Sequence, residues 1–188
     1  MKINVIENIL DRKLNYIHEN SAAVLVPILK PDESMTKLLM IQRSMNLKRN
    51  AGQVAFPGGL REEEETPDET ALREFEEELG VDRSEVTILG YLRPEIIEEH
   101  EIFVYPVVGW LKLSEDYEFI PNFEVKKILV DELNKILSTR RMSEKGIIFE
   151  LSGHTVWGAS SRILDDMYRR LKQSFHENRY KTKEGYLK

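Results

Sequence analysis

Apolar residues recur at two different spacings along the chain, and the two spacings predict a mixture of helices and strands. Ile3, Ile6, Leu10, Leu14 and Ile17 follow a helical interval, which predicts an amphipathic helix over residues 3–18. Short continuous apolar runs bounded by turn residues, such as the one at 22–29, indicate buried strands. By these criteria we expect strands at 22–29, 37–42, 53–56, 86–92, 102–110 and 146–151, further helices at 67–79, 129–138 and 157–174, and a turn at 31–34.

The helix expected at 67–79 carries start and stop signals of its own. Thr66, Pro67 and Glu69 fit a capping box with proline at the first helical position. Gly80 suits the left-handed residue that ends many helices. These local signals predict both ends of this helix.

The order of the elements and the composition limit the class of protein. Interleaved strands and helices over 188 residues predict one α/β or α+β domain, which we place at 19–175. Residues 1–18 are expected to form an amphipathic helical extension, and residues 176–188 a basic C-terminal tail. The chain has no cysteine, which excludes disulfides, thiolate metal sites and a cysteine nucleophile.

Charge and hydropathy exclude further classes of function. A net charge of −6 argues against nonspecific nucleic-acid binding. No apolar run approaches the roughly 18 residues of a membrane span, and no signal-peptide pattern is visible. We therefore expect a cytoplasmic protein that does not associate with membranes, with a homodimer left open.

The negative charge is concentrated in one segment. Residues 62–78 hold ten carboxylates and a single base, Arg73, so this segment carries −9 and the remainder of the chain +3. On a helix, Glu74, Glu77 and Glu78 share an outward face, where like charges repel. A hard divalent cation such as Mg²⁺ or Mn²⁺ would relieve that repulsion. The spacing alone leaves a solvated acidic face as the alternative.

Glycines directly before the acidic helix complete a motif. Gly58 and Gly59 can bring a strand end close to the helix and leave a backbone carbonyl free as a ligand. The stretch resembles the Nudix box, Gly-x5-Glu-x7-Arg-Glu-U-x-Glu-Glu-x-Gly-U, in which U is a bulky aliphatic or aromatic residue. The chain supplies every specified position: Gly59, Glu65, Arg73, Glu74, Phe75, Glu77, Glu78, Gly80 and Val81.

The resemblance implies a Nudix hydrolase with an α/β/α sandwich and a mixed β-sheet. Such enzymes use Mg²⁺ or Mn²⁺ to cleave a nucleoside diphosphate linked to another group. The resemblance also implies that Glu74 and Glu78 are the main metal ligands, that Glu77 assists, and that the carbonyl of Gly58 is a further ligand.

The same resemblance gives roles to residues around the metal. Glu65 would orient water or a neighbouring group, and Arg73 would hold the glutamates in place. The catalytic base is left open among Glu65, Glu77, Glu124 and the cluster at 98–101, of which His100 is more simply a loop-surface residue.

The residues before the box resemble the signature of the coenzyme A pyrophosphatase branch. The pattern is Arg-Ser-x3-Lys-x3-Gly-x3-Phe-Pro-Gly-Gly over residues 43–59, although this branch expects arginine where Lys48 stands. The resemblance implies coenzyme A as substrate. The residues expected to bind substrate all lie in this stretch: Arg43, Ser44, Lys48, Arg49 and Gln53.

Other interpretations remain open. Lys48 and Arg49 could belong to a solvated loop. The substrate could be ADP-ribose, NADH or a modified nucleoside triphosphate. A nucleotide-sensing module without catalysis is a further alternative, although a sensor has no need of a complete set of box glutamates.

Overall fold

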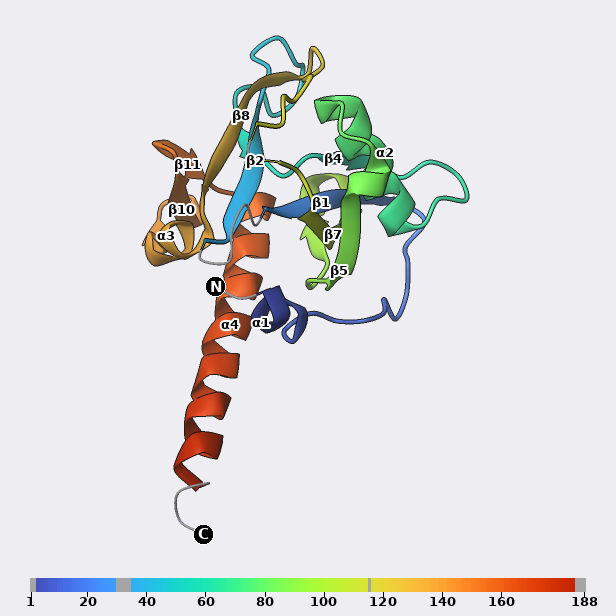
Figure 1. The fold of residues 1–188 in the computed structure, drawn as a ribbon. Helices are drawn as coiled ribbons and strands as arrows, with labels where there is room; N and C mark the ends of the chain where they lie inside the picture. Colours follow the sequence, from blue (N-terminus) through green and yellow to red (C-terminus); the bar gives the residue numbers. More distant parts are fainter. Residues whose placement is uncertain (1–2, 30–34, 115, 185–188) are drawn as a thin grey trace.

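The computed structural model describes residues 3–29, 35–114 and 116–184, and side chains as far as residue 176. Within that part of the chain, a sheet of eight strands forms the centre of the molecule (Figure 1). Its main path runs β3-β2-β1-β7-β5, with β4 paired to β1, β6 to β7 and β8 to β2. The strands are β1 (Ser21–Leu29), β2 (Lys37–Arg43), β3 (Val54–Ala55), β4 (Gly58–Leu60), β5 (Val86–Tyr91), β6 (Glu95–Ile97), β7 (Ile102–Leu111) and β8 (Val125–Glu132).

The sheet is mixed. β1 and β7 run parallel over their whole shared length, from Ser21 opposite Phe103 to Leu29 opposite Leu111. The other pairings in this sheet are antiparallel. A separate three-stranded sheet consists of β9 (Arg141–Ser143), β10 (Gly146–Leu151) and β11 (His154–Val156).

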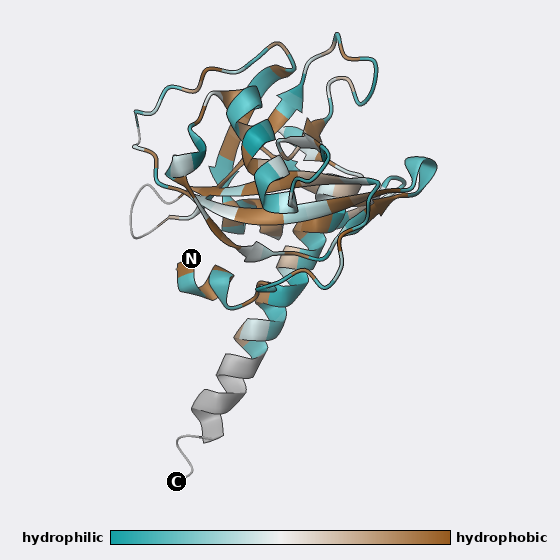
Figure 2. Cartoon of the chain, turned by 90° about the vertical axis from the view of Figure 1, so that its right-hand side faces the viewer, coloured by the Kyte–Doolittle hydropathy of each residue, from teal (hydrophilic) through white to brown (hydrophobic). Residues whose placement is uncertain are grey.

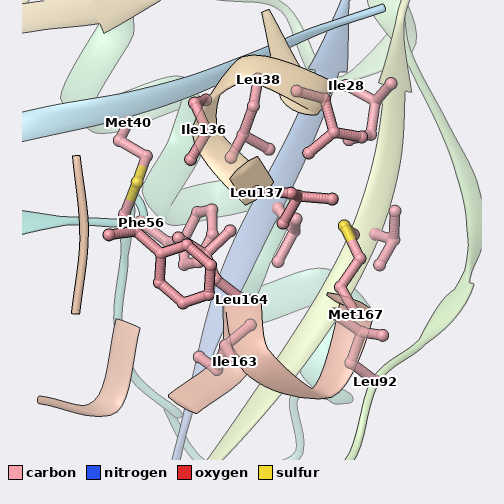
Figure 3. Close-up of a cluster of buried hydrophobic side chains, with 14 of the residues drawn as sticks. Ile28, Leu38, Met40, Phe56, Leu92, Ile136, Leu137, Ile163, Leu164 and Met167 are labelled. Atoms are coloured by element: carbon pink, nitrogen blue, oxygen red, sulfur yellow. The ribbon is translucent and has the colours of Figure 1, made fainter. Parts of the chain in front are cut away.

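Helices cover both faces of the central sheet, which confirms the expected α/β/α sandwich. Helix α2 (Pro67–Leu79) packs Ala71, Phe75 and Leu79 against one face. The opposite face is covered by α1 (Ile3–Glu7), α3 (Leu133–Ser138) and α4 (Ala159–Glu184), as Figure 3 shows for the core around Ile136 and Leu164.

Alternation along the strands explains this arrangement, because successive side chains point to opposite faces of a sheet. In β1, Ala23 and Leu25 belong to the α2 side, whereas Val26 and Ile28 belong to the α4 side. Figure 2 shows hydrophobic positions gathered in the sheet and hydrophilic ones on the loops and outer helical faces. No helix in the described ranges is long and apolar enough to span a membrane.

The boundaries predicted for the acidic helix are confirmed. Thr66 accepts a hydrogen bond from the backbone N–H of Glu69, and the Glu69 carboxylate accepts one from the N–H of Thr66 at 2.7 Å. Gly80 ends the helix with φ of 67°. The cap residues therefore fix both ends of α2 through local interactions alone.

Two of the expected helices are shorter than predicted. The first covers only Ile3–Glu7, because the backbone of Asp11 exchanges two hydrogen bonds with Tyr91 and is drawn into a bridge beside β5. Residues 129–138 begin as strand and become helix only at Leu133. Strand β8 pairs with β2, placing Leu129 opposite Met40, and this pairing overrides the helical pattern.

The chain ends also differ from the simplest expectation. Ile6 and Leu10 are buried in the main core although they lie in the N-terminal extension. Helix α4 continues to Glu184, into the segment expected to be a basic tail, and extends away from the sheet (Figure 1). The turn expected at 31–34 and the last four residues lie outside the described ranges.

Candidate active site

The Gly-Gly pair allows β4 to lie directly against β1 and α2. A Cβ atom on Gly58 would lie 2.3 Å from the carbonyl oxygen of Ala23, and Gly58 has φ of 151°. A Cβ atom on Gly59 would lie 2.3 Å from Oε1 of Glu74. No residue other than glycine fits either position without movement. The two glycines thus place backbone beside the carboxylates of the helix.

Glu78 lies against the backbone of Gly58 in β4 and is only 3% exposed. Its Oε2 accepts a hydrogen bond of 3.1 Å from the backbone N–H of Gly58. The pKa of Glu78 is raised to about 8, mainly by burial. Arg43 and the hydrogen bond from Gly58 oppose the increase, and the charges of Glu74 and Glu124 add to it. The expectation that Glu78 faces outward is therefore wrong, because β4 covers that part of the helix.

Arg73 holds three of the box glutamates. Its guanidinium binds both oxygens of Glu65, with Nε to Oε1 at 2.7 Å and Nη2 to Oε2 at 3.1 Å. Its Nη1 donates to Glu74 at 2.9 Å and lies 3.4 Å from Glu77. The bond to Arg73 lowers the pKa of Glu65 to about 2. Arg73 thus stands where the resemblance to the Nudix box places it, among the glutamates.

Arg43 connects the acidic helix to the segment directly before β8. Its Nη1 lies 3.8 Å from Glu78, and its Nη2 lies 3.4 Å from Glu124. The backbone N–H of Ser44 donates to the carbonyl of Glu124 at 2.7 Å, which fixes the two segments side by side. The Nε of Arg43 is buried and has no hydrogen-bond partner among the described residues. An anionic ligand would satisfy this donor.

The carboxylates of the described residues are not arranged as a complete set of metal ligands. Among the described residues, no three acidic or histidine side chains are grouped as metal ligands. Glu74 is held by Arg73, and Glu78 by Gly58 and Arg43. The donors nevertheless fit a hard divalent cation, since they are carboxylate oxygens. The raised pKa of Glu78 shows that its charged form is poorly compensated without a cation.

A pocket of about 730 Å³ opens beside Gly58 and Gly59. Five residues of the predicted site or motif line it: Arg43, Arg49, Gln53, Gly58 and Gly59. Ser44 and Lys48 do not line it, and Lys48 is exposed on the neighbouring loop. The volume lies in the range of small-molecule and cofactor sites.

The pocket also includes residues outside the stretch expected to bind substrate. Trp157 is only partly buried and lines the pocket. Glu99, in the cluster of candidate bases, and His100, expected on a loop surface, are exposed and line the same pocket. The sequence signal available for Trp157 was its place directly before a predicted helix.

Comparison with known proteins identifies the family. The NUDIX domain model matches residues 19–142, and the chain therefore belongs to the Nudix family. Nudix hydrolase 22 (chloroplastic) of Arabidopsis thaliana is 34% identical over 76% of this chain and 52% of its own length. Peroxisomal coenzyme A diphosphatase NUDT7 of Mus musculus is 34% identical over 72% of this chain and 56% of its own length. The chain thus spans little more than half the length of these two relatives.

The fold agrees with that of solved family members. A MutT/nudix family protein from Enterococcus faecalis superposes with a TM-score of 0.57 at 17% identity, over 87% of this chain and 66% of that one. At this identity the likeness concerns the fold alone.

Proposed function

We propose that this chain hydrolyses the diphosphate bond of coenzyme A with the help of Mg²⁺ or Mn²⁺, giving 4′-phosphopantetheine and adenosine 3′,5′-bisphosphate. The observation that carries the proposal is the pocket in which Gly58 and Gly59, beside the box carboxylates, meet Arg43 and Arg49. The unpaired Nε–H of Arg43 is suited to a phosphate oxygen. Diphosphate chemistry needs both features, cation-binding carboxylates on one side and cationic donors on the other.

The glutamates of α2 would hold the metal. Glu74 and Glu78 are the principal ligands, with Glu77 and the Gly58 carbonyl assisting. A bound divalent cation would neutralise diphosphate charge and acidify a water molecule. Arg73 supports this set by holding Glu74 through its bond of 2.9 Å, so that the carboxylate does not swing away.

We assign the general base to Glu124. Both Glu65 oxygens are bound by Arg73, and its pKa of about 2 makes it a poor proton acceptor near neutral pH. Arg43 lies within ion-pair distance of both Glu124 and the buried Glu78, so it links the two carboxylates. The side chain of Glu124 is 36% exposed. It can therefore meet both solvent and the acidic centre. It would take a proton from the water that attacks phosphorus, and the P–O bond of the leaving phosphate would break.

Coenzyme A is favoured over other nucleoside diphosphate derivatives by two observations. The segment at 43–59 resembles the signature of the coenzyme A branch, and a relative of 34% identity is named a coenzyme A diphosphatase. Arg49 at the pocket offers a cation for the 3′-phosphate, a group that ADP-ribose and NADH lack.

A substrate panel tests the proposal. Coenzyme A, ADP-ribose, NADH and a nucleoside triphosphate would be incubated with the protein and Mg²⁺ or Mn²⁺, and the products identified by mass. We expect 4′-phosphopantetheine and adenosine 3′,5′-bisphosphate from coenzyme A, with no turnover in the presence of a chelator. Faster cleavage of another compound would reassign the substrate. Binding without turnover of any compound would favour a sensing module.

A further inference from the structure

We propose that the indole ring of Trp157 is the platform on which the adenine ring of the substrate stacks. The inference rests on the proposed function in one respect, that the pocket beside Gly59 receives a nucleotide derivative. It adds a specificity-determining residue that lies far outside the Nudix box in the sequence. Trp157 lies between β11 and the first residue of α4, Ala159.

The surroundings of Trp157 leave it accessible from the pocket. The Nζ atom of Lys145 lies 4.7 Å from the centre of the indole ring, over one of its faces. Trp157 itself lines the pocket and is only partly buried. The adjoining Gly158 has no atom within 4 Å of where a Cβ would lie, so the backbone beside the ring is not crowded. The tryptophan is therefore in contact with Lys145 and still partly accessible.

The remaining walls suit a flat ring with polar edges. The pocket that Trp157 lines is also lined by the apolar residues Ile97, Ile102, Val104 and Ile163. Polar groups lie at the same pocket in Glu99, His100 and Ser160. A nucleobase has apolar faces and hydrogen-bonding edges, which match these two kinds of wall.

Trp157 shares its pocket with the groups that would bind the phosphates. The same pocket contains Gly58 and Gly59 beside the carboxylates, and Arg49 on the loop before β3. A nucleotide whose phosphates lie among these groups would place its base among the apolar residues. The pantetheine arm of coenzyme A is flexible and has no planar ring, so it would gain less from a rigid indole surface.

Fluorescence provides a direct test, because the chain contains only two tryptophans. Trp110 lies in β7 and does not line the pocket, so Trp110→Phe leaves Trp157 as the only tryptophan. We expect adenosine 3′,5′-bisphosphate to quench the emission of this variant with saturation. Ribose 5-phosphate and 4′-phosphopantetheine, which carry no base, should leave it nearly unchanged. Quenching by 4′-phosphopantetheine but not by the bisphosphate would overturn the proposal.

Steady-state kinetics provide the second test. Trp157→Leu should raise the KM for coenzyme A about tenfold while kcat changes less than about twofold, since stacking positions the base and does not act at phosphorus. Trp157→Phe keeps a ring and should recover most of the affinity. Trp110→Leu is the matched control and should leave KM unchanged. A melting curve for each variant separates loss of binding from loss of folding.

The outcomes separate this inference from the proposed function. Normal turnover of coenzyme A with an unchanged KM in Trp157→Leu would overturn the platform and leave the hydrolase proposal standing. If the parent protein cleaved no substrate, quenching by adenosine 3′,5′-bisphosphate would still support the platform, and its absence would still overturn it.

Discussion

Arg73 donates two hydrogen bonds to the carboxylate of Glu65, eight residues earlier in the sequence: Nε to Oε1 at 2.7 Å and Nη2 to Oε2 at 3.1 Å. Oε2 of Glu65 also accepts a bond of 2.8 Å from the hydroxyl of Thr70. The same guanidinium reaches Glu74. The loop before α2 and the helix itself are thereby tied together at the acidic site.

This ion pair should make part of the stability depend on pH at the acid end. The pKa of Glu65 is lowered from 4.5 to about 2 in the folded protein. Because the folded value is the lower one, the contribution is complete above pH 4.5 and disappears as the pH falls towards 2. Since Glu65 is largely buried, we expect a contribution on the order of 2 kcal/mol.

The measurement is denaturant unfolding of the parent and Glu65→Gln between pH 2 and 7. The variant should be less stable at pH 7, and the difference should shrink as the pH falls. Glu76→Gln is the control, because it breaks an exposed pair with Arg83, and such pairs contribute little. A difference between parent and Glu65→Gln that stays constant over the pH range would contradict the ion-pair argument.

Glu78→Gln should abolish most activity without unfolding the protein. The substitution keeps the shape of the side chain but removes the carboxylate that would bind the cation beside Gly58 and Arg43. Loss of one metal ligand should lower kcat by about 100-fold or more, the scale of removing one preorganised electrostatic group. Normal turnover of the variant at low Mg²⁺ would disprove the assignment of Glu78 as a ligand.

Mg²⁺ should raise the melting temperature of the parent protein. Glu78 is buried close enough to Glu74 and Glu124 for their charges to raise its pKa, and a bound cation would offset this repulsion. A ligand that binds only the folded state stabilises it increasingly with concentration. The increase should be much smaller in Glu78→Gln. Identical melting temperatures of the parent across a Mg²⁺ titration would count against the site.

Gly59→Ala should damage activity more than stability. The new Cβ would lie 2.3 Å from Oε1 of Glu74, so the flexible carboxylate must move away from its bond with Arg73. We expect kcat to fall at least about tenfold if Glu74 is a metal ligand, with a small change in melting temperature.

Gly153→Ala is the contrasting variant, which should reduce stability and not activity. Gly153 has φ of 77° and open space around a Cβ, far from the acidic helix in sequence. Alanine in this left-handed conformation should destabilise the fold by about 1 kcal/mol and leave kcat unchanged. Equal turnover by the Gly59→Ala variant and the parent would show that the position of Glu74 is not critical.

The 3′-phosphate of coenzyme A should be recognised mainly by Arg49. Arg49 lines the pocket and Lys48 does not. If the loop binds this phosphate, the parent should prefer coenzyme A over dephospho-coenzyme A by about tenfold or more in kcat/KM, the scale of one lost charge-assisted bond.

Arg49→Ala should remove most of that preference, Lys48→Ala should remove little, and the double variant should resemble Arg49→Ala. Turnover of dephospho-coenzyme A should stay nearly intact in all three. Equal kcat/KM of the parent for the two substrates would remove the basic loop from the site, although the diphosphate chemistry could stand.

Much of the catalytic helix was predictable because its signals are local. Thr66, Glu69 and Gly80 determine both ends of α2 through hydrogen bonds and backbone conformation within a few residues. The spacing of the box glutamates depends on the same helix, and so does the position of Arg73 among them. The buried strands β1, β2 and β7 were also predictable from their continuous apolar runs.

Where the sequence pattern was compatible with both helix and strand, only the tertiary structure decided between them. Pairing with β2 made residues 125–132 a strand, and the Asp11–Tyr91 bridge ended the first helix early. β4 buried Glu78, whose helical position alone suggested an outward face. The pocket unites Gly59 with Trp157, residues almost a hundred positions apart. Such contacts depend on strand pairing and loop packing over long sequence separations, which hydrophobic periodicity does not encode.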